Sequence, residues 1–328
     1  MSTVAITGAL SYTGRYIAST VLNGGGKVVS LSRRSVPIAA SPLTPSQIST
    51  ISSDRKTPDY GDENSLAKSL EGCDVLYSTY WVRFIKEGVD VHTVAAENCG
   101  RLFRAAKLAG VRKIVFTSHT QVANAPKGRF AYLDGKRRAE EFLADSGVDY
   151  GIARPCGIFG ETPEESILLN NAAWLIRRAP LFLVYGDGSH KFQPVHVRDL
   201  ADLMLDLGAS KENAQDVDAC GPDTPTALEL FSKIRDVTKS YALVAPAGPL
   251  LSTNAITQLT RPLNWFTGDV LLDDDELDFL ASGLTVAENP TDARIAPRKS
   301  LFTWLEQNGD TLGKSYVSSM ERYYTLKT

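Results

Sequence analysis

The sequence predicts an α/β fold, a doubly wound parallel sheet with a smaller, mostly helical C-terminal lobe, and three observations support it. Short β-rich apolar runs alternate with helical patterns through the first half of the 328-residue chain. A glycine-containing turn joins the first of these runs directly to the first helical pattern. The alternation ends near residue 155, after which helical patterns dominate. Because strands that alternate with helices of this length form right-handed βαβ units, the first half predicts a parallel sheet.

The elements of the first half can be placed in order. VAITG at 4–8 predicts the first strand, and a helix is expected over 14–22. KVVSLS at 27–32 predicts the second strand. The segment 35–53 is rich in proline, serine and threonine, which predicts an irregular loop that leads into a weak third strand. The later elements expected are a short helix in 64–73, strands at 74–81, 113–118 and 149–155, a helix over about 91–109, and a helix in 131–147.

The second half predicts a lobe and a return to the sheet. We expect residues 1–155 to form the parallel-sheet domain and residues 190–222 to return to it. Residues 156–189 and 223–328 are expected to form the smaller lobe, on the side of the substrate. Apolar periodicity predicts helical segments at 167–180, 226–238, 273–282 and 300–307, and the segment 194–208 predicts a strand or turn that leads into a helix.

Composition and charge exclude several classes of protein. A hydrophobic content of 43% and a charged content of 22% are typical of a folded globular protein. The net charge of −3 and the lack of a basic run argue against a nucleic-acid partner. The sequence contains no run of roughly 20 apolar residues, which is the length that a membrane-spanning helix requires. The first strand begins within three residues of the start, which predicts a cytoplasmic protein, or an organellar one if a presequence has been removed.

The cysteines give no sign of a disulfide framework. Cys73, Cys99, Cys156 and Cys220 lie far apart in the sequence and form no CxxC pair. We therefore expect four reduced thiols in the core, with no disulfide and no metal ligand among them.

The turn TGALSYTG joins the first strand to the first helix. In loops of the GxGxxG type, glycines permit positive φ and let backbone N–H groups approach a pyrophosphate at the helix N-terminus. This placement predicts nucleotide binding, although a tight turn without a ligand is the alternative. Ser11 stands where the middle glycine is usual, and its hydroxyl is expected to donate to a phosphate oxygen. The contacts predicted in this turn are Thr7, Gly8, Ser11, Tyr12, Thr13 and Gly14.

The end of the second strand predicts which dinucleotide binds. An acidic residue there would accept a hydrogen bond from a ribose 2′-OH, and none is present. Arg33 and Arg34 occupy the place instead, which favours a 2′-phosphate and hence NADP(H) over NAD(H). Two solvated loop arginines are the alternative. Asp59 and Tyr60 are expected on the adenine side, and Thr79 is expected among the cofactor contacts.

Several motifs occur in the order found in one protein family. They are the turn at Thr7, AAENCGRLFRAAKLAGVRKIVFTS (95–118), YLDGK (132–136), RPCGIFG (154–160) and QPVHVRDLA (193–201). Over nearly its whole length the chain resembles an atypical, extended short-chain dehydrogenase/reductase, which implies a Rossmann fold and an NAD(P) cofactor. DVLYSTYWVRF and DTLGKSYVSSMERYY are similar to bacterial NAD(P)-binding epimerase-like proteins. Those proteins are related to the nucleotide-binding accessory subunit of respiratory complex I, whose Ser-His pair resembles Ser118-His119.

The resemblance implies catalytic roles for Tyr132 and Lys136, the YxxxK pair of the family. At i and i+4 on a helix the two side chains share a face, where a lysine ammonium favours the phenolate form of a tyrosine. Tyr132 would then move a proton to or from a substrate oxygen, and Lys136 would also bond the nicotinamide ribose. A retained structural or cofactor-binding pair is the alternative, because Tyr323 and Lys327 have the same spacing near the C-terminus.

A serine or threonine is expected to orient the substrate oxygen. FTSHTQ offers Ser118 and Thr120, of which we favour Ser118, although it precedes Tyr132 by only 14 positions. His119 is expected to be an exposed loop residue at the strand end. The resemblance further implies that Pro155 lies next to the nicotinamide carboxamide.

Substrate contacts are expected from the aromatic-rich stretch that follows the strand at 74–81. Tyr80, Trp81 and Arg83 are the candidates there, and Asn171 is the candidate from the second half. Such a wall suits a ring or a modest anion, whereas packing in the core is the alternative for its aromatic residues.

Together these patterns predict an NADP(H)-dependent oxidoreductase, or an epimerase/dehydratase-like enzyme, that acts by hydride transfer on a small hydroxyl or carbonyl substrate. The alternative is a redox-silent NAD(P)H-binding structural or sensor protein, similar to the complex I accessory subunit or to NmrA-like regulators. A small-molecule substrate is expected, with no nucleic acid and no metal. The sequence is compatible both with a homodimer and with docking to a larger complex.

Overall fold

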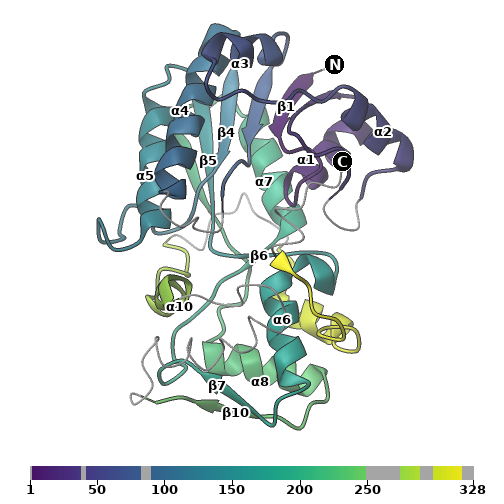
Figure 1. Ribbon diagram of the computed structural model, residues 1–328, viewed down its shortest axis with the longest axis vertical. Helices are drawn as coiled ribbons and strands as arrows, with labels where there is room; N and C mark the ends of the chain where they lie inside the picture. The colour runs from purple at the N-terminus through teal and green to yellow at the C-terminus, as the bar shows by residue number, and fades with distance from the viewer. Residues whose placement is uncertain (1, 38–41, 83–89, 249–273, 289–297, 320–328) are drawn as a thin grey trace.

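The computed structural model describes residues 2–37, 42–82, 90–248, 274–288 and 298–319. Its centre is a six-stranded sheet in the order β2-β1-β3-β4-β5-β9 (Figure 1). The strands are β1 (Thr3–Thr7), β2 (Lys27–Leu31), β3 (Val75–Ser78), β4 (Lys113–Thr117), β5 (Asp149–Pro155) and β9 (Gln215–Ala219). All neighbouring strands in this sheet are parallel. The predicted doubly wound parallel sheet is therefore confirmed.

Helices cover both faces of this sheet. One face packs against α1, α2 and α7, and the other against α3, α4 and α5. Along each central strand the side chains alternate between the two cores, so that Ile6 and Val115 face the first core while Ala5 and Ile114 face the second. The bounds are α1 (Gly14–Asn23), α2 (Pro45–Ser53), α3 (Glu63–Leu70), α4 (Val91–Leu108), α5 (Ala131–Ala144) and α7 (Val197–Ala209).

The segment expected to be an irregular loop with a weak third strand contains the helix α2 instead. Thr44 and Gln47 form a capping box at its start, in which each side chain accepts a hydrogen bond from the other residue's backbone N–H. This local signal outweighs a composition rich in residues that favour turns. The strand expected here is reduced to one isolated bridge, between Leu31 and Lys56.

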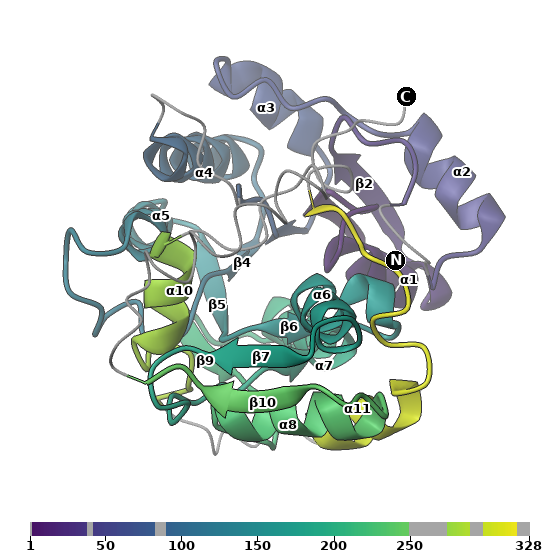
Figure 2. The same ribbon diagram turned by 60° about the horizontal axis from the view of Figure 1, so that its bottom comes forward.

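A smaller lobe lies beyond the carboxyl ends of the strands (Figures 1 and 2). Its core is built around side chains such as Phe159, Ile176, Ile234 and Leu305. Its elements are β6 (Ile158–Phe159), the 3₁₀ turn η1 (Pro163–Glu165), α6 (Ile167–Ile176), β7 (Leu181–Val184), β8 (Val195–His196), α8 (Ala227–Val237), β10 (Leu243–Pro246), α10 (Asp274–Ala281) and α11 (Leu301–Asn308). The domain boundaries expected from the sequence stay a prediction.

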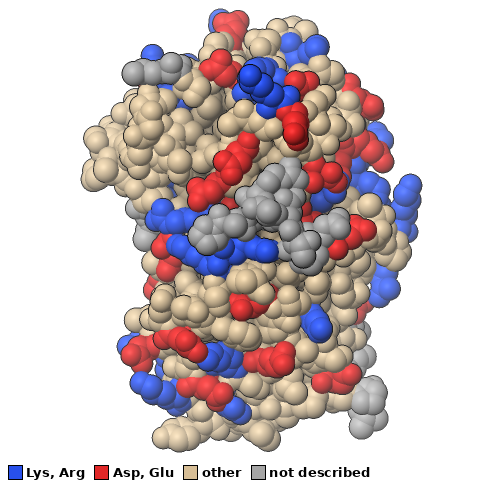
Figure 3. Space-filling model, turned by 180° about the vertical axis from the view of Figure 1, so that it is seen from behind, with Lys and Arg blue, Asp and Glu red and all other residues tan. Residues whose placement is uncertain are grey.

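Charged side chains of both signs are interspersed over the face of the molecule shown in Figure 3, with a basic group at the level between the sheet and the lobe. Among the described residues, no helix is both long enough and apolar enough to cross a membrane. The same part of the chain contains no group of three or more His, Cys, Asp or Glu side chains placed to hold a metal ion.

Candidate functional site

The turn between β1 and α1 has the backbone geometry of an anion-binding loop. Gly8 adopts φ of 79°, a conformation that a residue with a Cβ atom rarely adopts. Thr13 is the N-cap of α1 but makes no side-chain capping bond, whereas α2, α3 and α4 are each capped by a side chain. The N–H groups of Arg15 and Tyr16 donate to the carbonyls of Ser11 and Thr13, so the N-terminus of α1 offers an anionic ligand mainly its positive dipole end. These features fit the pyrophosphate of a dinucleotide.

Ser11 closes the turn itself. Its hydroxyl donates to the carbonyl oxygen of Gly8 at 2.6 Å, and its backbone N–H donates to the same oxygen at 2.8 Å. The structure thus differs from the expected contact, because the single hydroxyl proton is directed at the loop and not at a phosphate oxygen. The serine replaces a glycine here without loss of the turn, since its side chain supplies a bond that tightens it.

Gly14 is required by close packing of the helix against the turn. A Cβ atom at this position would lie 2.1 Å from the carbonyl oxygen of Gly8. We expect Gly14→Ala to lower the free energy of unfolding by about 2–3 kcal/mol and to abolish tight dinucleotide binding, because the turn must shift to relieve the clash. Urea unfolding and a fluorescence titration with NADPH measure the two effects.

Gly24→Ala is the matched control for this substitution. Gly24 has φ of −80°, and a Cβ atom there would be 3.4 Å from its nearest neighbour, which is ordinary contact. We expect this variant to bind NADPH as the wild type does. Equal binding by the Gly14 variant would contradict the assignment of the turn.

The strand ends on the predicted adenine side bring two tyrosine rings and one basic group together. The rings of Tyr60 and Tyr80 stack with centroids 5.1 Å apart, and Asn98 donates to the Tyr80 hydroxyl at 3.2 Å. Burial raises the pKa of both tyrosines, and the charge of the exposed Arg33 acts on both in the opposite direction. Tyr80 was expected on the substrate side, but it lies with the predicted nucleotide contacts. The carboxylate of Asp59, which is exposed, accepts the Gly61 N–H at 2.9 Å.

Two threonines tie the ends of β1 and β3 beside the turn. The Thr79 N–H donates to the hydroxyl of Thr7 at 2.7 Å, and the Thr79 hydroxyl donates to the carbonyl of Thr7 at 2.7 Å. Both residues therefore hold the strand ends in register at the predicted cofactor edge. On the outer side, the backbone N–H of Arg34 donates to the Ser32 hydroxyl at 3.0 Å.

Lys136 is buried at the carboxyl end of β4. It is 3% exposed, and its ammonium donates to the carbonyl of Thr117 at 2.8 Å. The indole ring of Trp81 lies over the ammonium, with the ring centroid 3.9 Å from Nζ. Burial lowers the pKa of Lys136 to about 7. Trp81, expected to contact substrate, thus covers the catalytic candidate instead.

Tyr132, the other half of the pair, is surrounded by rings. Its ring makes edge contacts with Trp81, His92 and His119 at centroid distances of 6.1, 5.5 and 5.7 Å. Phe279 of α10 lies 6.2 Å away on a further side. Lys136 Nζ is 5.8 Å from the centre of the ring, so the two members of the motif share a face as predicted from their spacing.

The buried polar groups distinguish Ser118 from Thr120. The Thr120 hydroxyl donates to the carboxylate of Asp218 at 2.9 Å and is fully buried. The Ser118 hydroxyl is buried too, and among the described residues it has no hydrogen-bond partner. A buried hydroxyl without a partner costs free energy, and Ser118 directly follows Thr117, whose carbonyl accepts the Lys136 ammonium, so this hydroxyl fits a hydrogen bond to a ligand.

His119 is buried, which corrects the expectation of an exposed loop residue. Its Nδ1 lies 2.7 Å from the carbonyl oxygen of Thr120, and its Nε2 lies 3.0 Å from the carbonyl oxygen of Cys156. Burial lowers the pKa of His119 to about 4, an effect larger than that of the two carbonyls, which favour the charged form. The neutral ring has one N–H, so only one carbonyl receives a hydrogen bond at neutral pH.

The burial of Lys136 predicts a pH-dependent effect on stability. Its pKa is about 7 in the folded protein and near 10.5 in the unfolded chain, so the folded state binds fewer protons between these values. Stability therefore rises with pH in this window, and the buried charge opposes folding most below pH 7. We expect Lys136→Met to raise the free energy of unfolding by about 3 kcal/mol at pH 6.5, a gain that declines steadily toward pH 10.

Urea unfolding at several pH values measures this effect, and Lys127→Met is its control. Lys127 is exposed, and its substitution is expected to change the free energy of unfolding by less than about 0.5 kcal/mol. A constant gain for Lys136→Met across the range would contradict the origin proposed for it.

The lobe holds an apolar cavity of about 240 Å³. Residues of α6, β7, α8 and α10 line it, and the described residues around it include no Asp, Glu, Lys or Arg side chain. Asn171 faces the cavity, but its amide donates to Val317 O at 2.9 Å and accepts the Val317 N–H at 3.1 Å. The polar side chains in the lining are Ser166, Asn171, Tyr185, His190, Gln193, Thr285 and Ser319.

Two segments connect the cavity to the ring cluster around Tyr132. Pro155 ends β5, and its carbonyl accepts the Thr120 N–H at 3.1 Å, while the next residue, Cys156, lines the cavity. In α10, Leu277 and Leu280 line the cavity while Phe279 contacts Tyr132. Arg83, Tyr323 and Lys327 lie outside the described residues.

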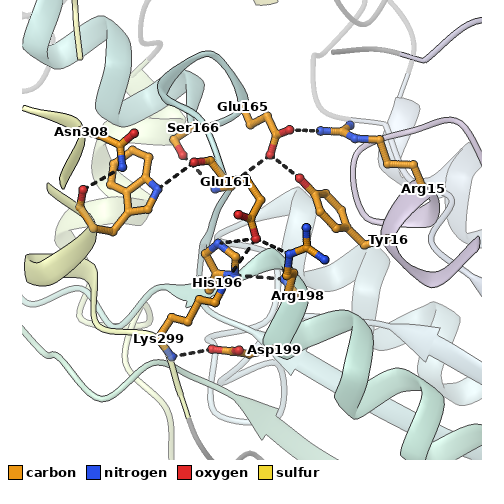
Figure 4. Close-up of polar contacts among 12 residues, drawn as sticks. Arg15, Tyr16, Glu161, Glu165, Ser166, His196, Arg198, Asp199, Lys299 and Asn308 are labelled. Carbon is orange, nitrogen blue, oxygen red and sulfur yellow. Dashed lines mark hydrogen bonds and ion pairs between the residues drawn. The ribbon is translucent and has the colours of Figure 1, made fainter. Parts of the chain in front are cut away.

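A buried ion pair joins the nucleotide turn to the lobe (Figure 4). Arg15, the residue after Gly14, is fully buried and pairs with Glu165 at 2.7 Å. The other carboxylate oxygen of Glu165 accepts the Tyr16 hydroxyl at 2.7 Å and the Glu161 N–H at 2.9 Å. This contact was not predicted from the sequence. The available signal was an arginine in the first turn of α1, at the end of a helix dipole that disfavours a cation.

A second charged group lies beside this pair. The Glu161 carboxylate contacts Arg198, Lys299 and His196, and Lys299 lies at 3.1 Å (Figure 4). His196 is buried, and burial lowers its pKa to about 4. The two clusters hold the lobe against the turn and the first turn of α7.

A family model described as NAD(P)H-binding matches residues 8–173, about half of the chain. The chain belongs to the NAD(P)H-binding family. Quinone oxidoreductase 2 of Escherichia coli K12 is 29% identical over 153 residues, which cover 46% of this chain and 47% of that protein. An uncharacterised Mycobacterium tuberculosis H37Rv protein is 25% identical over 214 residues, or 62% of this chain and 21% of that protein. The chain thus matches about half or less of the length of these curated relatives.

Solved structures share the fold of this NAD(P)H-binding protein. The E. coli NADPH-dependent quinone oxidoreductase complexed with NADPH has a TM-score of 0.68 at 20% identity, with 93% of this chain and 99% of that chain covered. The Citrobacter triphenylmethane reductase with NADP(H) has a TM-score of 0.69 at 14% identity, covering 94% and 99%. UDP-glucose 4-epimerase of Brucella ovis with NAD has 0.58 at 17%, covering 76% and 86%. The NAD(P)-binding family and the Rossmann-like fold implied by the sequence resemblance are confirmed.

Proposed function

We propose that the protein is an NADP(H)-dependent reductase of an uncharged, largely apolar carbonyl compound, with quinones as the first class to test. The observation that carries this proposal is the apolar cavity of the lobe, which has no charged side chain among its described lining residues and adjoins the ring cluster around Tyr132. A relative and structural neighbours named as quinone oxidoreductases and a triphenylmethane reductase support the same class of substrate.

In this proposal three residues of the chain have different roles in catalysis. Bound NADPH would supply the hydride. Tyr132 would give a proton to the carbonyl oxygen, and the buried hydroxyl of Ser118 would hold that oxygen in place. The Lys136 ammonium, on the same face of α5, would stabilise the phenolate that remains. The rings around Tyr132 would exclude water from this exchange.

The cavity argues against a nucleotide sugar as the substrate. A diphosphate is bound in proteins by arginine, lysine or a helix N-terminus, because its charge must be compensated. The described lining of the cavity offers no arginine or lysine. The epimerase-like alternative is therefore less favoured than reduction of a neutral carbonyl.

A redox-silent NAD(P)H-binding protein is the second candidate, and one observation favours it. Trp81 covers the ammonium of Lys136, which is only 3% exposed, so the group that would bond a cofactor ribose is shielded. An enzyme of the proposed type requires this indole to move aside when the cofactor binds.

Oxidation of NADPH distinguishes the two candidates. We expect turnover with neutral quinones and apolar aromatic carbonyls, and much weaker turnover with sulfonated quinones or UDP-sugars. A protein that binds NADPH but oxidises it with none of these compounds would support the redox-silent alternative. Preference for the sulfonated quinones would contradict the assignment of the apolar cavity.

The cofactor preference makes a separate prediction. If Arg33 and Arg34 bind the 2′-phosphate, their joint replacement by alanine removes charge-assisted hydrogen bonds worth about 2 kcal/mol. We therefore expect the double variant to bind NADPH at least about tenfold more weakly, with NADH affinity almost unchanged. Lys27→Ala, an exposed residue at the opposite end of β2, is the control and should leave both affinities unchanged. Tighter binding of NADH than NADPH by the wild type would refute the preference.

A further inference from the structure

Two cysteines meet at the carboxyl ends of β5 and β9. These strands are parallel neighbours in which Pro155 pairs with Ala219, so Cys156 and Cys220 are the next residues on each. The two cysteines pack together with Ala287 in a small buried cluster. Neighbouring parallel strands lie about 4.8 Å apart, which is within the range of Cα separations of about 4.4–6.8 Å found in disulfides. Both cysteines are thiols in this structure.

The surroundings of the two sulfur atoms differ. An arginine nitrogen, Nη1 of Arg298, donates to the Cys220 sulfur at 3.3 Å. A guanidinium at this distance stabilises a thiolate, which is the reactive form. Cys156 lines the apolar cavity, and burial, followed by the proximity of Cys220, raises the pKa of its thiol well above the ordinary value. We therefore expect Cys220 to react first, as a thiolate, and Cys156 to react second, as a thiol.

We propose that Cys156 and Cys220 form an oxidisable dithiol, which a hydroperoxide converts to a disulfide. In the first step the Cys220 sulfur attacks the O–O bond of hydrogen peroxide, an S–O bond forms, and water leaves. In the second step the Cys156 sulfur attacks the resulting sulfenic acid, the S–S bond forms, and a second water leaves. Two thiols lose two electrons and two protons, and one peroxide is reduced to two waters.

The disulfide would act on both the cavity and the ring cluster. Cys156 belongs to the cavity wall, and its carbonyl oxygen lies 3.0 Å from Nε2 of His119, which contacts Tyr132. The bond would also close the segment 157–219, which restricts the unfolded chain. We therefore expect the oxidised protein to unfold at a higher temperature than the reduced protein.

Thiol counting on the native protein tests the proposal without any assay of turnover. The wild type is treated with hydrogen peroxide in its native state, then unfolded in the presence of an alkylating agent, and mapped by mass spectrometry. The expected result is a fall from four alkylated cysteines to two, a peptide linked through Cys156 and Cys220, and a return to four after dithiothreitol. Four alkylated cysteines throughout, or oxidation of Cys220 to a sulfinic acid without a link, would overturn the proposal.

Matched variants separate the pair from the other cysteines. Cys73→Ser and Cys99→Ser alter buried thiols whose pKa burial raises to about 11 and about 12, and the 156–220 link should form in both. Arg298→Met should slow its formation about tenfold or more, because the thiolate loses its cation. An unchanged rate in this variant would contradict the role given to Cys220. The outcome does not depend on the proposed reductase activity.

Discussion

Replacing Glu165 with glutamine is expected to lower the free energy of unfolding by about 3–5 kcal/mol, which is the typical cost of breaking a buried ion pair from one side. The carboxylate is 1% exposed and pairs with an arginine that is fully buried. When the charge of Glu165 is removed, the charged guanidinium of Arg15 stays unpaired in a site from which water is excluded. The amide would also place a donor against the Glu161 N–H, which now donates to the carboxylate at 2.9 Å.

Two comparisons make this prediction specific. Glu164→Gln alters the neighbouring exposed glutamate and should change the free energy of unfolding by less than about 0.5 kcal/mol. The double variant Arg15→Met with Glu165→Leu removes both charges, so it should recover much of the stability lost in the single variant. Urea unfolding measures all three. If the single and double variants are equally destabilised, packing and not the unpaired charge is the cause.

Replacing Tyr132 with phenylalanine is expected to reduce turnover by about 10²–10⁴-fold, the usual contribution of a general acid. The prediction rests on the proposed reductase function, in which the phenol protonates the carbonyl oxygen. The ring would keep its contacts with Trp81, His92 and His119, because the phenol oxygen takes no part in them. NADPH affinity and stability should therefore stay near the wild-type values.

Tyr150→Phe is the matched control for this loss. Tyr150 is also partly buried, but it lies at the amino-terminal end of β5, on the opposite edge of the sheet from the site. Steady-state rates with a quinone that the wild type reduces, together with NADPH titration, give the two readouts. Unchanged turnover in the Tyr132 variant would show that Tyr132 is not the proton donor, and Ser118 or bound water would then have that role.

The nucleotide-binding half could be predicted from the sequence because its signals are local. The alternation of apolar runs with helical patterns determines a parallel sheet, since each strand and helix is specified by its own short segment. The glycines of the first turn are likewise local: Gly8 needs positive φ, and Gly14 must pack close to it. The helix α2 was missed because composition was weighed above the capping box at Thr44 and Gln47.

The candidate site depended instead on contacts between residues far apart in the sequence. Motif spacing places Tyr132 and Lys136 on one face of a helix, but only the fold puts the ring of Trp81 over the lysine. The hydroxyl of Thr120 donates to Asp218, which lies on a different strand, and only this contact excludes Thr120 as the residue that orients the substrate. The burial of His119 likewise arises from segments that no local pattern brings together.

The sequence by itself thus determined the class of fold, the nucleotide turn and the helix that carries the YxxxK motif, because neighbouring residues specify them. The tertiary structure alone decided which polar groups are buried, which are paired, and where the apolar cavity lies. The reason is physical: burial and pairing depend on which distant segments meet. Arg15 and Glu165 are adjacent only because the lobe folds back onto the first helix, and Cys156 and Cys220 only because β9 joins β5.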